Sequence, residues 1–376
     1  MTVFDLKQLK YHFQNRKGWM NDPNGLVFYR GRFHAFFQHY PHAPRWGQMH
    51  WGHCVSDDLI TWDELPIALY PDQPYDNGKN GGCFSGSAIE KDGRLYLFYT
   101  SVDESGRQTQ SLAFTDDGAV FTKYEGNPII DDCPLGSNQD FRDPKVFRFG
   151  SEYRMVVGAG VRNTGSILLY RSTDLIHWDY IGQLLEDGRF GNVIECPNLF
   201  PLEDKWVLMF SSIKAMPYRV IFAVGDFDGT TFTPEIPDGQ PDTWPYFTIE
   251  TGPDFYAPQI LDMPDGRKVN IAWMYNWSRR EDKGQLQVGA FTFPREMAFD
   301  KAGRLTMLPI TEAMHLLKKE STFVLYDNGE LRIRFGDRTV LARPYAKEPD
   351  VLTLEDVGCV ELFINGGVEN ITVYVC

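Results

Sequence analysis

Short apolar strands separated by tight turns recur five times along the first 300 residues of the chain. Each copy joins one strand to a second, more apolar strand across a turn that carries glycine, aspartate or serine. The copies occupy residues 25–37, 87–99, 145–157, 198–210 and 259–273. Glycine and aspartate suit such turns because they tolerate the positive φ that a tight hairpin requires. The pattern therefore predicts five β-hairpins.

A second motif follows each of the first four hairpins and repeats with the same spacing. Each copy places small polar residues before an aromatic residue, at Trp62, Phe121, Trp178 and Phe232. Two independent markers that share a period of roughly 57 residues indicate an internal repeat. A unit of that length, built from short strands, matches one four-stranded blade of a β-propeller. A β-sandwich also contains many short strands but does not repeat so regularly. We therefore expect an all-β fold with a five-bladed β-propeller.

The pattern changes after Pro309. Ile310, Ala313, Met314 and Leu317 follow the spacing of one helix face, which predicts a short helix. Further strands are expected at residues 322–326, 331–335, 351–354, 360–364 and 371–375. This predicts a propeller over residues 1–300, a linker with a short helix over 301–320, and a small, truncated β-sandwich-like domain over 321–376. Because so short a segment buries little surface by itself, we expect it to lean on the propeller or on a neighbouring subunit.

Charge and cysteine usage narrow the class of partner. The net charge is −14, with no basic cluster, and such a field repels nucleic acid and anionic membranes. Residues 1–10 contain no apolar stretch typical of a signal peptide, and no run approaches the roughly 20 apolar residues that cross a bilayer. The six cysteines form no Cys-x-x-Cys pair and are expected to be buried, reduced thiols. We expect a cytoplasmic protein with neither metal nor cofactor.

Three acidic residues stand at the expected starts of innermost strands. Asp22 and Asp143 directly precede a proline, and Glu195 precedes one by two positions. Since innermost strands line the centre of a propeller, their carboxyl groups should converge there. Converging carboxylates repel one another and raise at least one pKa. Glycoside cleavage uses such a set, with one carboxylate as nucleophile and one carboxylic acid as proton donor. A single Asp-Pro is more often a turn device, so a non-catalytic carbohydrate-binding propeller is an alternative.

Longer motifs around these acids resemble glycoside hydrolase family 32, which includes invertases, inulinases, levanases and sucrose-6-phosphate hydrolases. The three acidic motifs are WMNDPNG at Trp19–Gly25, FRDP at Phe141–Pro144 and ECP at Glu195–Pro197. Further motifs that resemble the family, in the same order, lie at residues 46–53, 84–87, 108–113, 252–257, 273–277 and 294–296. The resemblance covers residues 11–300. It implies a five-bladed propeller followed by a β-sandwich.

The resemblance also implies a role for each acid. Asp22 matches the nucleophile that attacks the anomeric carbon of the fructosyl unit. Glu195 matches the general acid and base, and Asp143 matches the residue that binds fructose hydroxyls and stabilises the transition state. The implied substrate-binding residues are Asn21, Gln38, Trp46, Trp51, Phe84, Ser85, Arg142, Tyr256 and Trp277. We expect Arg142 near Asp143, Tyr256 and Trp277 on the leaving-group side, and His50 and His53 as structural hydrogen-bonding residues.

The sequence therefore predicts a retaining β-fructofuranosidase that hydrolyses terminal, non-reducing β-D-fructofuranosides, with sucrose or sucrose 6-phosphate favoured. Fructosyl transfer and exo-acting hydrolysis of inulin or levan use the same acids and stay open. An inverting arabinanase on a similar propeller is disfavoured by the Trp19–Gly25 and Glu195–Pro197 motifs. The C-terminal segment is shorter than the usual sandwich of the family, although residues 360–367 resemble its closing strands. Because short sheets leave open edges, we expect a homodimer to cover them.

Overall fold

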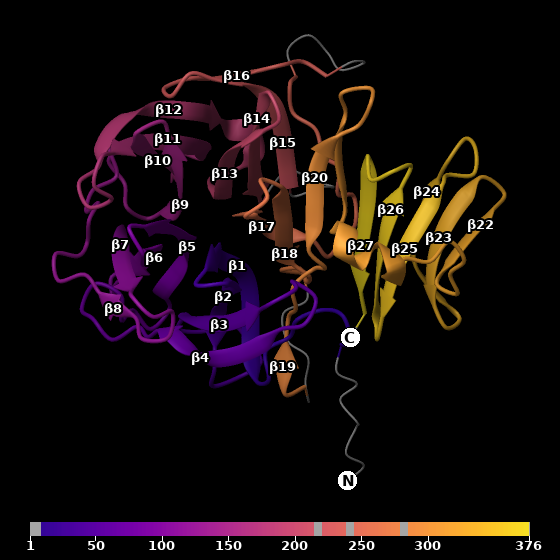
Figure 1. Cartoon of the computed structure of the whole chain (residues 1–376), viewed down its shortest axis with the longest axis horizontal. Coiled ribbons are helices and arrows are strands. Elements are labelled where there is room, and N and C mark those ends of the chain that lie inside the picture. The colour runs from indigo at the N-terminus through magenta and orange to yellow at the C-terminus, as the bar shows by residue number, and fades with distance from the viewer. Residues whose placement is uncertain (1–8, 214–219, 238–243, 279–284, 376) are drawn as a thin grey trace.

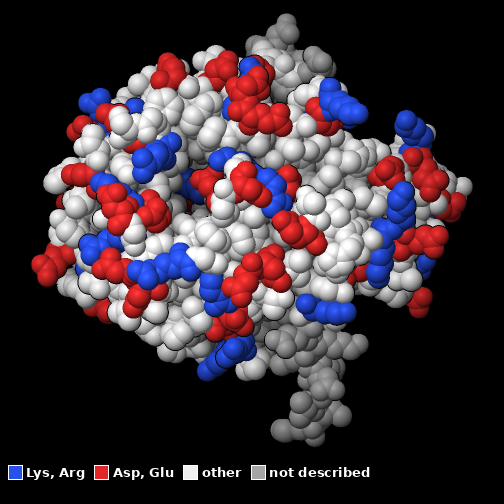
Figure 2. Space-filling view, viewed as in Figure 1, with Lys and Arg blue, Asp and Glu red and all other residues white. Residues whose placement is uncertain are grey.

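The computed structural model describes residues 9–213, 220–237, 244–278 and 285–375, and nearly all of their regular structure is β. Cys376 and residues 1–8, for which expectations were stated above, lie outside these ranges. Five sheets of four or five strands surround a common centre, and two three-stranded sheets lie to one side (Figure 1). None of the helices described is long and apolar enough to cross a membrane. Acidic and basic side chains are interspersed over the face shown in Figure 2.

Four of the five ring sheets contain strands that are consecutive in the chain. The first contains β1 (Gly18–Tyr29), β2 (Arg32–Tyr40), β3 (His50–Ser56) and β4 (Asp63–Leu69), and the second contains β5 (Gly82–Lys91), β6 (Arg94–Val102), β7 (Gln108–Thr115) and β8 (Thr122–Lys123). The third contains β9 (Phe141–Phe149), β10 (Glu152–Val161), β11 (Thr164–Ser172) and β12 (Asp179–Asp187). The fourth contains β13 (Ile194–Leu202), β14 (Lys205–Ser212), β15 (Val220–Phe227) and β16 (Phe232–Pro234).

The fifth sheet closes the ring. It contains β17 (Tyr256–Asp262), β18 (Lys268–Trp273), β20 (Arg295–Phe299) and β21 (Leu305–Pro309). The intervening strand β19 (Gln287–Val288) leaves this sheet and pairs in parallel with β1 of the first sheet. The chain thus joins its fifth sheet to its first through backbone hydrogen bonds.

All five predicted hairpins are present, and two of their turns show why the sequence revealed them. The β1–β2 turn has φ of 49° at Arg30 and 82° at Gly31. The β5–β6 turn has φ of 54° at Asp92 and 83° at Gly93. Positive φ at both central residues is the two-residue turn whose twist matches that of the flanking strands.

The second repeated motif forms the turn between the third and fourth strands of the first four sheets. In each copy an aspartate side chain accepts hydrogen bonds from two backbone N–H groups further along the chain. The four aspartates are Asp58, Asp117, Asp174 and Asp228. Because this side chain supplies the turn with its hydrogen-bond acceptor, the motif recurs in similar form wherever the turn recurs.

Each pair of neighbouring ring sheets shares its own apolar cluster. Strand β10 shows the principle, because successive side chains of a strand point to opposite faces. Met155 and Val157 pack toward the second sheet, whereas Val156 packs toward the fourth. A strand with both faces covered needs apolar residues at nearly every position, and this is the pattern from which the second strand of each hairpin was predicted.

The C-terminal segment forms two small sheets, one of which is buried on both faces. The outer sheet contains β22 (Val324–Asp327), β23 (Glu330–Phe335) and β24 (Arg338–Pro344), and the inner sheet contains β25 (Val351–Asp356), β26 (Cys359–Ile364) and β27 (Glu369–Tyr374). Val360 and Leu362 of the inner sheet pack against the outer sheet. Phe363 and Leu354 pack against residues of the first and fifth ring sheets. The segment therefore leans on the ring, one of the two arrangements expected.

Two features of this segment differ from the expectation, and a third difference lies just before it. The predicted helix is the 3₁₀ helix η2 (Thr311–Leu316), in which Ala313 is buried but Met314 is 40% exposed. Three residues per turn put positions i and i+3 on one face and move i+4 off it. Strand β24 was not predicted, because its residues are exposed or half-buried and show little apolar patterning. Strand β21 extends the fifth sheet to Pro309, beyond residue 300.

Candidate active site

All five innermost strands carry a β-bulge at the same place. In each, two consecutive residues stand opposite a single residue of the second strand. The five pairs are Asn21–Asp22, Phe84–Ser85, Asp143–Pro144, Cys196–Pro197 and Ala257–Pro258. A bulge bends the strand and re-aims its side chains. Five bulges in register therefore redirect neighbouring side chains at one end of the ring.

The three predicted acids occupy successive positions around this bulge, whereas the sequence suggested equivalent ones. Asp22 is the second residue of its bulge, Asp143 is the first of its own, and Glu195 directly precedes a third. The strands also begin earlier than expected, β1 at Gly18. Since successive residues of a strand point in different directions, this stagger lets three carboxyl groups approach one point from three directions.

A cavity of about 340 Å³ lies among these residues. It is lined by Asn21, Asp22, Gln38, Trp46, Phe84, Ser85, Gln108, Asp140, Arg142, Asp143, Glu195 and Trp277. The structure thus brings together all three predicted acids and seven of the nine predicted substrate-binding residues. A concave site of this size, with aromatic walls and a few polar groups, suits a small ligand.

Asp22 is held by hydrogen bonds to both of its carboxylate oxygens. Asn21 donates from Nδ2 to Oδ1 at 2.8 Å, and Ser85 donates from Oγ to Oδ2 at 2.6 Å. Trp19 donates from Nε1 to Asn21 Oδ1 at 2.7 Å, which orients the amide. Burial raises the pKa of Asp22, while the hydrogen bonds from Ser85 and Asn21 act in the opposite direction.

Glu195 is held by a guanidinium group and a phenol. Arg142 donates from Nη2 to Glu195 Oε1 at 3.0 Å, and the Tyr256 hydroxyl donates to Oε2. Arg142 also donates from Nη1 to Asp140 Oδ1 at 2.7 Å. Arg142 was expected near Asp143, and its charge does act on that residue, although its hydrogen bonds to carboxylates go to Asp140 and Glu195. Burial, together with the Glu195 charge, raises the pKa of Tyr256 well above its usual value.

Asp143 is 4% exposed, and burial raises its pKa to about 7. The Arg142 charge opposes this rise, and the Asp22 and Glu195 charges add to it. The Cys196 backbone N–H donates to Asp143 Oδ2 at 2.9 Å. The Cys196 thiol has its sulfur 3.5 Å from an oxygen of both Asp22 and Asp143. It lies between two carboxyl groups, and burial raises its pKa well above the usual value.

Some of the predicted aromatic residues line the cavity, and the others lie behind its lining. Trp46 is 37% exposed and meets Phe84 edge to face, with ring centroids 6.3 Å apart. Trp277 stacks on Trp19 at 5.8 Å. Trp51 does not line the cavity; it is fully buried and donates from Nε1 to the Phe84 carbonyl oxygen at 2.9 Å. Tyr256 also lies behind the lining and reaches the cavity through Glu195.

The remaining polar side chains are tied to the backbone or to one another. Gln38 donates from Nε2 to the Cys83 carbonyl oxygen at 2.9 Å. His53 Nε2 lies 3.0 Å from His34 Nδ1, and His50 Nδ1 lies 3.0 Å from the Gln48 carbonyl oxygen. Burial lowers the pKa of His50 to about 4 and that of His53 to about 3. Both histidines are neutral hydrogen-bonding residues, as the sequence suggested.

Gln108 and Asp140 line the cavity but were not predicted as site residues. Gln108 Oε1 accepts hydrogen bonds from the Phe141 N–H at 2.9 Å and from Arg142 Nη1 at 3.3 Å. Both residues had a signal in the sequence. Gln108 opens one of the family-like motifs, and Asp140 stands two positions before Arg142.

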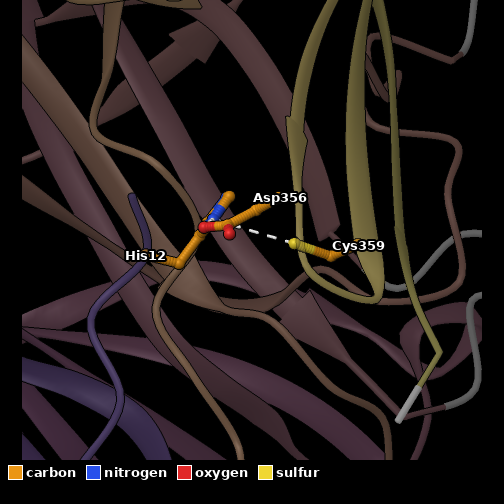
Figure 3. A group of neighbouring side chains, drawn as sticks. All are labelled: His12, Asp356 and Cys359. Atoms are coloured by element: carbon orange, nitrogen blue, oxygen red, sulfur yellow. Dashed lines mark hydrogen bonds and ion pairs between the residues drawn. The ribbon is translucent and has the colours of Figure 1, made fainter. Parts of the chain in front are cut away.

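A second buried cluster lies between the ring and the inner C-terminal sheet (Figure 3). His12, Asp356 and Cys359 bring one potential metal-binding atom each to within 4.8 Å of the others. These atoms already have partners, since Asp356 accepts hydrogen bonds from Lys10 N, Tyr11 N and His12 Nδ1. The other ring nitrogen of His12 lies 3.1 Å from Glu361 Oε1. The cluster joins residues 10–12 to strands β25 and β26.

Comparison with known proteins gives a consistent result. Residues 12–309 match the model of the glycosyl hydrolases family 32 N-terminal domain. A levanase of Bacillus subtilis is 39% identical over 81% of this chain and 47% of its own length, and a sucrose-6-phosphate hydrolase of Escherichia coli is 39% identical over 83% and 66%. The chain thus spans about half to two thirds of these relatives. A Bombyx mori β-fructofuranosidase, solved as a mutant in complex with sucrose, has a TM-score of 0.84 at 28% identity, covering 98% of this chain and 89% of its own.

Proposed function

Since the chain belongs to glycoside hydrolase family 32, we propose that it is a retaining β-fructofuranosidase that hydrolyses terminal, non-reducing β-D-fructofuranosides. One observation carries the proposal: Asp22, Asp143 and Glu195, from three different sheets, line a single cavity of about 340 Å³. A pair of carboxyl groups flanking one sugar is the chemical requirement for glycoside cleavage. Sucrose and sucrose 6-phosphate are the favoured substrates.

Asp22 is the proposed nucleophile. Its carboxylate attacks the anomeric carbon of the fructosyl unit and forms a covalent fructosyl-enzyme, while the leaving oxygen takes a proton from Glu195. Asn21 and Ser85 each donate to one oxygen of Asp22. These two hydrogen bonds favour the ionised form that attack requires, and they fix the direction in which the carboxylate points.

Glu195 is the proposed general acid and base. After protonating the leaving group it removes a proton from the water that cleaves the fructosyl-enzyme, so two inversions give net retention. Arg142 and Tyr256 each contact one of its oxygens. Because both contacts come from groups that donate hydrogen bonds, they stabilise the carboxylate that remains once the proton has left.

Asp143 is the proposed partner of the fructose hydroxyls and the transition-state stabiliser. Its pKa of about 7 means that a fraction of the molecules carries the proton at neutral pH. A carboxyl group in that range can accept from one sugar hydroxyl and donate to another. Its charge also favours the oxocarbenium-like transition state, which is more positive than the bound sugar.

The proposed substrate contacts follow from the lining. Trp46 and Phe84 line the cavity edge to face, and Trp277 lines it while stacked on Trp19. Asn21, Gln38, Ser85 and Arg142 offer hydrogen bonds within the cavity. Trp51 and Tyr256 support the site from behind, Trp51 through Phe84 and Tyr256 through Glu195.

We propose that the five ring sheets are the blades of a five-bladed β-propeller and that the two small sheets form a short β-sandwich. Separate apolar clusters between neighbouring sheets support the first part, and the cluster between the two small sheets supports the second. Strand β21 supports a propeller boundary at Pro309, which is also where the family match ends.

A cytoplasmic location and a homodimer are proposed on narrower grounds. The five cysteines that the structure describes are all free and buried, which suits a reducing compartment. Leu325 of the outer C-terminal sheet is 44% exposed, and a second copy could cover this sheet. Light scattering at micromolar concentration tests the dimer, and a clean monomer would contradict it.

The test of the function is a product assay on sucrose, sucrose 6-phosphate, kestose, inulin and levan. We expect free fructose from the disaccharides, released first as the β anomer in a proton NMR time course. Release of the α anomer, or no hydrolysis of any fructoside, would contradict the proposal. Exo-acting fructan hydrolysis is the second candidate, supported by the levanase relative. It predicts faster release from levan or inulin than from sucrose, and fructosyl transfer predicts products longer than the substrate.

A further inference from the structure

The backbone of Asp143 adopts an unusual conformation that a neighbouring sheet supports. Its φ is 66°, in the left-handed region that residues other than glycine seldom occupy. The Asp143 backbone N–H donates to Thr100 Oγ1 at 2.9 Å. Thr100 lies in β6 of the second sheet, whereas Asp143 lies in β9 of the third. A hydroxyl group of one sheet therefore holds the bulge of the next.

The Thr100 hydroxyl has a defined orientation. It donates its proton to Gln110 Oε1 at 2.8 Å, and both side chains are fully buried. With the proton committed to Gln110, the Thr100 oxygen presents a lone pair to the Asp143 N–H. Gln110 is fixed in turn, because its Nε2 donates to the Phe141 carbonyl oxygen at 2.8 Å.

Gln108 belongs to the same strand as Gln110 and binds the same stretch of backbone. It stands two positions before Gln110 in β7, so the two side chains share a face. Its Oε1 accepts from the Phe141 N–H, and Gln110 donates to the Phe141 carbonyl oxygen. Both polar groups of one residue, two positions before Asp143, are thus bound by the second sheet.

The held backbone determines where the Asp143 carboxyl group points. Its Oδ2 accepts a hydrogen bond from the Cys196 N–H at 2.9 Å, and Cys196 also lies in the left-handed region, with φ of 47°. The hydrogen bonds therefore run from Gln110 through Thr100 and Asp143 to Cys196, across three sheets. The loss of the Thr100 hydroxyl would therefore alter the Asp143 backbone, and with it the position of the carboxyl group.

We propose that Thr100, oriented by Gln110, is a positioning residue that fixes the Asp143 backbone and so aims its carboxyl group at the bound sugar. The inference rests on the proposed function, which gives Asp143 its contact with the fructosyl unit. Thr100 is absent from the lining of the cavity and acts on the reaction only through Asp143.

The test is the variant Thr100→Val, which keeps the shape of the side chain and removes its hydroxyl. A small misplacement of a group that acts in the transition state lowers turnover more than binding. We therefore expect kcat to fall about 100-fold while KM changes by less than about threefold. Thr100→Ser keeps the hydroxyl and should restore kcat to within about fivefold. An unchanged kcat in Thr100→Val would overturn the proposal.

Ser101→Ala provides the matched control. Ser101 is the next residue of the same strand and is equally buried, and its hydroxyl lies 2.8 Å from Thr109 Oγ1 and 2.7 Å from Ser111 Oγ. The variant removes buried hydrogen bonds of β6 and β7 without touching Asp143. We expect a loss of thermal stability like that of Thr100→Val, with near-normal kcat. An equal fall of kcat in both variants would show a general packing effect and overturn the positioning role.

A crystal structure of Thr100→Val separates this inference from the proposed function. We expect Asp143 to leave the left-handed region, or its Oδ2 to move away from the Cys196 N–H. An Asp143 unchanged in the variant would overturn the positioning role, whatever the activity. If the wild-type chain hydrolyses no fructoside, the proposed function fails, and this structure still decides whether Thr100 holds Asp143.

Discussion

The pKa values of two groups of buried acids in this molecule shift in opposite directions. In the cavity of the candidate active site, burial raises the pKa of Asp22 and raises that of Asp143 to about 7. Between the ring and the inner C-terminal sheet, Glu361 has a lowered pKa, and that of Asp356 falls to about 2. Burial alone raises the pKa of all four acids, so their partners decide the outcome.

The interface acids have cations or a dense set of donors for their oxygens. Arg295 donates to Glu361 and to Glu250, and all three side chains are buried. His12 lies between Asp356 and Glu361. In the cavity the only cation among the lining residues that the structure describes is Arg142, and it is shared between Asp140 and Glu195. The interface acids therefore stabilise the packing of the sheets, whereas neither Asp22 nor Asp143 has a hydrogen bond to a cation among the described residues.

The strongest test of this contrast is the removal of one acid from each group. Asp22→Asn or Glu195→Gln should lower kcat/KM by roughly 10⁴-fold or more without loss of melting temperature, because the proposed nucleophile or proton donor is lost. Glu361→Gln should do the opposite and lower the melting temperature while leaving kcat per folded molecule near normal. Steady-state kinetics and thermal unfolding on the same samples measure both effects. Near-normal turnover in Asp22→Asn would end the catalytic assignment.

Removal of the interface cation should cost the most stability. Arg295→Met leaves Glu250 and Glu361 buried without their guanidinium partner, and breaking a buried ion pair on one side costs about 3–5 kcal/mol. Denaturant unfolding measures this change. The matched control is Arg304→Met at the surface pair with Asp300, where we expect a much smaller loss because water screens the pair. Similar losses in the two variants would contradict the structural role of the buried network.

The dependence of stability on pH should have opposite signs in the two groups. The pKa of Asp356 is lower in the folded chain than in the unfolded one, so its stabilisation is present above about pH 4 and is lost as the pH falls toward 2. The pKa of Asp143 is raised instead, so the folded state loses stability as the pH rises from about 4 to 7.

Asparagine variants measure these two contributions separately. Asp356→Asn should be less stable than the wild type at pH 7, with a gap that closes toward pH 2. Asp143→Asn should be more stable than the wild type at pH 8 and should lose that advantage near pH 4. Melting temperatures across this range decide the matter. The same sign for both variants would remove the distinction between the two groups.

The smallest expected effect comes from the phenol behind Glu195. Tyr256→Phe removes one hydrogen bond to the Glu195 carboxylate and leaves the Arg142 contact in place. We expect kcat/KM to fall about tenfold, the equivalent of one charge-assisted hydrogen bond. Steady-state kinetics on sucrose measure this change. An unchanged kcat/KM would mean that Tyr256 serves packing alone.

The sequence predicted what depends on local patterns and missed what depends on contacts between sheets. The hairpins were predicted from turn residues such as Gly31 and Gly93, because glycine itself tolerates the positive φ that these turns require. The acids were found because short motifs surround them. The contact of Arg142 with Glu195 was not predictable, since the two residues meet only after the third and fourth sheets pack together. Strand β24 was missed because its pairing rests on backbone hydrogen bonds and not on an apolar pattern.

The parallel pairing of β1 with β19 has a consequence for the order in which this protein forms during synthesis. Gly18 and Trp19 can pair only after Gln287 and Val288 have left the ribosome. Lys10 and Tyr11 can donate their backbone hydrogen bonds only after Asp356 has been made. Contacts of such long sequence separation slow folding and leave apolar surface exposed meanwhile. Asp22, only three residues after Trp19, is therefore made long before the residues that complete its sheet.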